Sequence, residues 1–177
     1  VHITVNDVAP YALFYAGSPY TFTKDSAISP ITPSSLGGAV VTWSVAPTLP
    51  SGLTIDSSTG TISGTPTTIT LSSTYVITAV NSGGSDNVSI VIQVNDIVPS
   101  ISYSGTPCTL TKDATMSPAA PTNSGGTVVS WSVTPGLPAG LTLSTTTGVI
   151  TGTPTAVTSS ATYTISATNT GGTASTI

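Results

Sequence analysis

The stretch Leu49–Thr67, LPSGLTIDSSTGTISGTPT, decides the fold because the chain contains it twice. It returns 88 positions later, at Leu137–Thr155, as LPAGLTLSTTTGVITGTPT. The match extends outward from this stretch: at the same offset, Tyr15–Ser89 aligns with Tyr103–Ile177, and about half of the aligned residues are identical. The 177 residues therefore contain two copies of one module of about 88 residues.

Each module consists of short β-branched and aromatic runs between closely spaced glycines and prolines. Apolar and polar residues alternate around Trp43 and around Ile77, and no segment has the 3.6-residue period of a helix. About seven short strands per module, with turn signals roughly every 8 to 12 residues, are typical of an antiparallel β-sandwich. The predicted fold class is therefore all-β, with two tandem sandwiches.

Two aromatic positions favour the immunoglobulin-like form of this sandwich. A tryptophan lies in the predicted third strand, and a tyrosine opens the sixth, two residues before the position of the second cysteine of an antibody domain. Here that position is an isoleucine, so aliphatic packing replaces the disulfide. The tyrosine hydroxyl is a candidate for the corner bond to the backbone. The predicted structural core comprises Trp43, Trp131, Tyr75, Tyr163, Ile77 and Ile165.

Three runs carry a resemblance to a known family: Leu49–Thr54, Thr59–Thr67 and Tyr75–Gly84, each of which recurs in the second module. They resemble the Ig-like repeat of bacterial haemagglutinins and other large surface proteins. That resemblance covers nearly the whole chain. It implies tandem arrays, an extracellular location and adhesive or architectural work, and it implies no catalysis and no defined functional residues.

The repeat is also distantly similar to cadherin-type domains, whose interdomain calcium sites use an Asn-Asp step before a proline. The chain has such steps but contains no glutamate. Calcium takes six to eight oxygen ligands, several of them usually carboxylates. We therefore expect no metal or other cofactor, and instead Asx-type linker turns at Asn6, Asp7, Asn95 and Asp96.

The modules are circularly out of phase with the ends of the sequence. Val1–Asp7 matches Ile90–Asp96, the last strand of the first module, at an offset of 89, and Ile177 corresponds to Ser89, just before that strand. The predicted division is an orphan last strand at 1–7, a first module at 8–96, and a second module at 97–177 that lacks its last strand.

Two arrangements fit this phase. Either the segment is a window on a covalent array of modules, or separate chains join by β-strand addition. In the second case, the inter-subunit strand carries Val1, Ile3 and Val5 into the open sandwich of the next copy. Both arrangements predict a linear assembly whose partners are copies of the chain or adjacent Ig-like modules.

Composition excludes several function classes. Only 5% of the residues are charged, the net charge is -4, and the chain has two lysines and no arginine. So few cations cannot neutralise a phosphate backbone, and we therefore expect no nucleic-acid partner. No apolar run approaches 18 residues, so we expect no membrane insertion. His2 is the only histidine, and neither a zinc site nor a Ser-His-Asp or Cys-His constellation can be assembled. We predict no catalytic residues and no enzyme.

The predicted function is that of a structural component of an extracellular filament or surface stalk. The alternative is an adhesin module that binds a glycan or a protein of a host or cell surface. The cluster Tyr11, Phe14 and Tyr15 is the aromatic group that such a module could offer, although Tyr15 itself is expected in the core. Cys108 aligns with Tyr20, and we expect it to be a small core residue.

Overall fold

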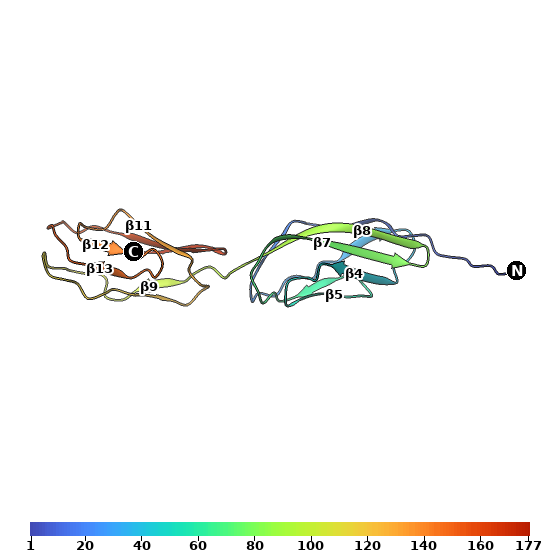
Figure 1. The fold of residues 1–177 in the computed structure, drawn as a ribbon, viewed down its shortest axis with the longest axis horizontal. Coiled ribbons are helices and arrows are strands. Elements are labelled where there is room, and N and C mark those ends of the chain that lie inside the picture. The colour runs from blue at the N-terminus through green and yellow to red at the C-terminus, as the bar shows by residue number, and fades with distance from the viewer. The chain divides into compact units, whose positions relative to one another are not determined.

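The computed structural model describes all 177 residues, and they contain strands and no helix (Figure 1). The chain divides into two compact units, Val1–Asn95 and Asp96–Ile177, here called unit 1 and unit 2. The prediction of an all-β chain with two tandem Ig-like sandwiches is confirmed. Asp96 falls in unit 2 because its backbone N–H and its carboxylate make their hydrogen bonds there.

Unit 1 is a sandwich of two layers. One layer is a four-stranded sheet in the order β2-β8-β7-β4. The other contains the pairs β1-β3 and β5-β6, joined by a bridge between Ile31 and Ile62. The strands are β1 (Tyr11–Tyr15), β2 (Tyr20–Thr23), β3 (Pro33–Leu36), β4 (Thr42–Ala46), β5 (Leu53–Ile55), β6 (Ile62–Gly64), β7 (Thr70–Asn81) and β8 (Gly84–Asn95).

One strand pair of unit 1 departs from the predicted antiparallel pattern. β2 runs parallel to β8, with Tyr20 opposite Ile92 and Phe22 opposite Val94. The short segment between β1 and β2 carries the chain from one sheet to the other, so β2 becomes the edge strand of the four-stranded sheet and lies along β8 in the same direction. Sequence alternation does not reveal this direction, because parallel and antiparallel partners bury the same face.

Unit 2 repeats this architecture with fewer and shorter strands. Its main sheet has the order β11-β14-β15, and the pairs β9-β10 and β12-β13 are joined by a bridge between Ala119 and Ile150. The strands are β9 (Ile101–Tyr103), β10 (Pro121–Asn123), β11 (Ser130–Thr134), β12 (Leu141–Leu143), β13 (Ile150–Gly152), β14 (Thr164–Asn169) and β15 (Gly172–Thr176). No strand of unit 2 corresponds to β2.

The prediction for Cys108 is wrong, because this residue is exposed. Its counterpart Tyr20 belongs to β2, which is held in place by backbone pairing with Ile92–Asn95 of β8. Unit 2 has no strand in the place of Ile92–Asn95, so the segment around Cys108 has no sheet to join.

Candidate functional site

The second half of β8, residues 90–95, completes the core of unit 1. Ile90, Ile92 and Val94 alternate along the strand, and each is at most 1% exposed. β8 pairs on one side with β7, where Tyr75 lies opposite Ile90 and Thr70 opposite Val94. On its other side it pairs with β2. This half-strand therefore holds two neighbouring strands as well as filling the core.

Unit 2 is open at the equivalent place. β14 begins at Thr164, so residues 158–163 form no strand, although their counterparts 70–75 are the first half of β7. Residues 108–111, the counterparts of β2, also form no strand. Between these two segments lies a groove of about 790 Å³. Its apolar lining includes Leu110, Met116, Leu141, Ile150, Tyr163 and Ile165.

The segment Val1–Asp7, here called the N-terminal tail, forms no strand and pairs with none, and its one hydrogen bond runs from the Asp7 N–H to Ser82 Oγ. Figure 1 shows it extending away from the sandwich of unit 1. The side chains of Val1, Ile3 and Val5 are each more than 80% exposed. Aliphatic side chains at every second position are the alternation of a strand that has one apolar face.

The six predicted core residues fall into two groups. Trp43, Tyr75 and Ile77 are buried in unit 1. In unit 2, Trp131 and Ile165 are buried, but Tyr163 is only half-buried, lies outside any strand, and borders the groove.

A tyrosine, a tryptophan and a glycine meet in the core of each unit. Tyr15 and Trp43 pack edge to face with ring centroids 6.5 Å apart, and the Tyr15 hydroxyl donates a hydrogen bond of 2.5 Å to the Gly60 carbonyl. Gly60 has φ +73°, and a Cβ there would lie 2.5 Å from the Trp43 ring. Only glycine allows this close approach.

The same arrangement recurs in unit 2 with Tyr103, Trp131 and Gly148. Burial raises the pKa of Tyr15 well above its usual range, with a smaller contribution from Tyr20, and burial raises the pKa of Tyr103 to about 12. Sequence reasoning assigned the corner hydroxyl bond to Tyr75 and Tyr163. The structure shows no such bond at either residue. Instead, the hydroxyls of Tyr15 and Tyr103 bond to the backbone, and their glycine partners lie in recurring Thr-Gly steps.

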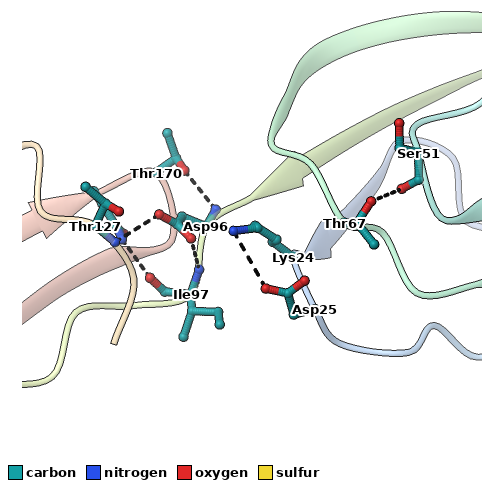
Figure 2. A network of polar contacts seen from close by, with 9 residues as sticks. Lys24, Asp25, Ser51, Thr67, Asp96, Ile97, Thr127 and Thr170 are labelled. Carbon is teal, nitrogen blue, oxygen red and sulfur yellow. Dashed lines mark hydrogen bonds and ion pairs between the residues drawn. The ribbon is translucent and has the colours of Figure 1, made fainter. Parts of the chain in front are cut away.

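The predicted linker residues do not form Asx-type turns. Asn6 lies in the exposed tail, Asn95 is the last residue of β8, and the Asp7 N–H donates to Ser82 Oγ. Asp96 is buried: its carboxylate accepts the N–H groups of Ile97 and Thr127, and its own N–H donates to Thr170 Oγ1 (Figure 2).

Side-chain turns form instead at one buried asparagine in the last hairpin of each unit, Asn81 in unit 1 and Asn169 in unit 2. Asn81 Oδ1 accepts the Gly83 N–H at 2.8 Å, and its Nδ2 donates to the Val8 carbonyl at 2.7 Å. Asn169 bonds to Gly171 and to the Ile97 carbonyl in the same way. Each asparagine therefore ties the entry of its unit to the turn between the last two strands. Sequence reasoning missed this pair, because the partners lie more than 70 residues apart.

Two pairs of charged residues lie together in turns. Lys24 and Asp25 form an exposed ion pair at 3.7 Å in a turn (Figure 2), and Lys112 pairs with Asp113 in the same way. No group of three or more His, Cys, Asp or Glu side chains lies together. None of the chain's segments is a helix long and apolar enough to cross a membrane.

The family model described as Putative Ig domain (He_PIG) matches residues 2–95 and again residues 94–177. The chain belongs to this Ig-domain family. The two matches cover nearly all of the sequence, and each includes one of the Tyr-Trp-Gly arrangements. Among curated proteins, none matches the chain.

Solved structures share the Ig-like fold at low sequence identity. Domains 3–5 of the Drosophila OTK extracellular region are 16% identical with a TM-score of 0.54, over 93% of this chain and 59% of that one. The N-terminal four Ig domains of Dscam1 isoform 9.44 are 16% identical with a TM-score of 0.53, over 97% and 45%. The chain thus spans about half the length of these neighbours.

Proposed function

We propose that the chain is a structural part of an extracellular filament or surface stalk built from tandem Ig-like modules, which are joined covalently or by donated strands. The observation that carries this proposal is the repetition itself. Unit 2 begins at the residue that follows unit 1, and both units use the same Tyr-Trp-Gly core. Modules that each have their own core and follow one another without a linker build linear arrays.

The chemistry of the surface supports an extracellular location. The chain has two lysines and no arginine, so trypsin-like proteases find few cleavage sites. Ser and Thr, about a third of the residues, provide the polar groups that charges provide in most soluble domains. The matched OTK fragment is itself described as extracellular.

The test is the mass of the native polypeptide after boiling in detergent, together with electron microscopy of the material before boiling. A mass far above 17.5 kDa supports a covalent array. A mass near 17.5 kDa from filamentous material supports subunits joined by strands. Material of that mass that is already globular before boiling, or that surface labelling of intact cells fails to reach, would contradict the proposal.

An adhesin module is the second candidate, and one observation favours it. Tyr11 and Phe14 of β1 are each more than half exposed, and exposed aromatic side chains are common in binding sites. The test is saturable binding to a glycan or cell surface by the isolated chain. Loss of binding in Phe14→Ala, with binding retained in the control Val41→Ala, would support this role, because Val41 is also exposed.

A further inference from the structure

We propose that the groove of unit 2 binds the N-terminal tail of a second copy of this chain as a β-strand. The inference rests on the proposed function and names what joins successive copies. Its basis is that the tail has the sequence pattern of the strand that fills the same place in unit 1. Val1, Ile3 and Val5 of the tail correspond to Ile90, Ile92 and Val94, which are fully buried in unit 1.

Unit 1 supplies the register of the inserted strand. Tyr20 lies opposite Ile92 and Phe22 opposite Val94 in the parallel pair of β2 and β8. By the repeat, Cys108 then lies opposite Ile3 and Leu110 opposite Val5. On its other side, β8 pairs with β7 in the antiparallel direction, and Ser73 lies opposite Ile92. By the repeat, Ala161 then lies opposite Ile3 on the side of the tail away from Cys108.

The groove offers what strand addition requires. Residues 108–110 and 158–163 border it without forming strands, and none of their backbone N–H or C=O groups takes part in a backbone hydrogen bond, so both sides of the groove offer them. Its lining includes Leu141, Ile150 and Ile165, whose counterparts belong to the same core cluster as Ile90, Ile92 and Val94 in unit 1. Apolar side chains at alternate positions of the tail therefore enter an apolar groove, and the backbone completes two ladders.

Unit 1 cannot receive the tail, because β8 already occupies the equivalent place. The tail also joins unit 1 at the β7–β8 turn, where the Asp7 N–H bonds to Ser82 and Asn81 bonds to Val8. Unit 2 is attached at the other end of β8, after Asn95. The strand β8 spans about 40 Å, whereas seven extended residues reach about 25 Å, so the tail does not reach the end of unit 1 at which the chain continues into unit 2. The tail of a second copy is not bound by this limit.

The first experiment compares two charge substitutions in the full chain, Ile3→Asp and Thr4→Asp, by sedimentation velocity over a range of concentrations. The unaltered chain is expected to form head-to-tail oligomers. Ile3→Asp is expected to raise the dissociation constant at least about tenfold, because it places a charge in the groove. Thr4→Asp is the matched control, since the counterpart of Thr4 faces away from the core, and it should associate almost normally. Both positions lie in the exposed tail, so neither variant threatens folding.

The second experiment tests the register by disulfide formation. Cα atoms of directly opposed residues on neighbouring strands lie within the range that a disulfide can bridge. Ile3→Cys is therefore expected to form an intermolecular disulfide with Cys108 under mild oxidation, and to give a ladder of covalent multimers on a non-reducing gel. Thr4→Cys, which faces the other way, and Ile3→Cys combined with Cys108→Ser should give no such ladder.

Three results would overturn the inference. One is a chain that stays monomeric at all concentrations, and another is equal association of Ile3→Asp and Thr4→Asp. The third is an Ile3→Cys variant whose new thiol forms its disulfide with Cys108 of the same chain. None of these results would contradict the proposed function, because a covalent array needs no exchanged strand. The mass of the native polypeptide tests that array separately.

Discussion

Tyr75 is 5% exposed in the middle of β7, whereas its counterpart Tyr163 is half-buried and lies outside any strand. The two units share about half of their aligned residues, so local sequence does not explain this difference. The reason is the neighbour: Tyr75 pairs with Ile90 of β8, and β15 ends before any such residue. In unit 1 both segments that pair with residues 90–95 are strands, whereas their counterparts in unit 2 are not.

The two units differ in one part of the core and agree in another. Trp131 of β11 and Ala167 of β14, which lie opposite each other, are as buried as Trp43 and Ala79 in unit 1. Leu141 and Ile150, which border the groove, are only partly buried, although Leu53 and Ile62 are buried in unit 1. In unit 2 the part of the core around Trp131 and Ala167 is therefore closed. The part around Leu141 and Ile150, which residues 90–95 complete in unit 1, is open.

The largest effect is expected from completing unit 2. A copy of residues 90–95, IVIQVN, appended after Ile177 should remove the difference between the units. Burial of three aliphatic side chains stabilises by about 1.5 to 3 kcal/mol each, so the free energy of unfolding of unit 2 should rise by about 4.5 to 9 kcal/mol. Urea denaturation followed by Trp131 fluorescence in a Trp43→Phe background measures this change.

That measurement belongs in the Ile3→Asp background, so that no second copy contributes a strand. The control is the appended sequence SVSQSN, which has the same length and a similar backbone but no apolar side chains for the groove. If both extensions stabilised unit 2 equally, the core around Leu141 and Ile150 would not depend on the apolar side chains of the added strand. The missing strand would then not explain the difference between the two units.

A smaller effect is expected from removing the central tryptophans. Trp43→Ala should cost about 3 to 5 kcal/mol, because it opens a cavity in a closed core. Trp131→Ala should cost less, since the open core of unit 2 can collapse around the gap. Thermal unfolding of each variant, followed by far-UV circular dichroism, tests this order. A loss below about 1 kcal/mol for Trp43→Ala would mean that Trp43 does not carry the core.

The tyrosine hydroxyls should give an effect of about 1 to 3 kcal/mol. Tyr15→Phe leaves the Gly60 carbonyl without its partner in a closed core. Tyr103→Phe should cost less, because Tyr103 is only partly buried, and water can reach its partner. Urea midpoints of the two variants against the unaltered chain compare them directly.

The same hydroxyls predict an alkaline instability. The folded pKa of Tyr103 is about 12, above the ordinary value of 10, and that of Tyr15 is also raised. A raised folded pKa contributes stability that is complete below pH 10 and is lost as the pH rises through the folded value. Stability should therefore fall between about pH 10 and 12, and less so in the Phe variants. An unchanged slope in Tyr103→Phe would assign the loss to another group.

The smallest effect is expected at Asp56. Its carboxylate accepts bonds from the Ser58 hydroxyl and the N–H groups of Ser58 and Thr59, and the Ser58 hydroxyl bond contributes most to lowering its pKa to about 2. Its contribution is therefore present above about pH 4 and is lost as the pH falls toward 2. Asp56→Ser, which introduces the residue that unit 2 carries as Ser144, should remove this acid dependence and change stability at pH 7 only slightly. Acid titration of the urea midpoint measures it.

Much of the fold follows from residue spacing. The offset between Leu49 and Leu137 predicts two modules, and the alternation around Trp43 and Ile77 predicts strands with a buried face. Both signals are local, because they depend on period and on turn residues. The bonds that close each unit are not local: Tyr15 reaches Gly60, and Asn81 reaches Val8. Spacing alone cannot say which of several tyrosines or asparagines makes such a bond.

The sequence by itself determined the repeat, the all-β class, the neutral hydroxyl-rich surface and the match between Val1–Asp7 and Ile90–Asp96. Only the tertiary structure decided which equivalent residues are buried. Cys108 and Tyr163 occupy the places of Tyr20 and Tyr75, but they are exposed and half-buried. The physical reason is that a strand gains its stability from backbone bonds and apolar contacts with its neighbours. In unit 2 the equivalent residues lie outside the sheet and line the groove.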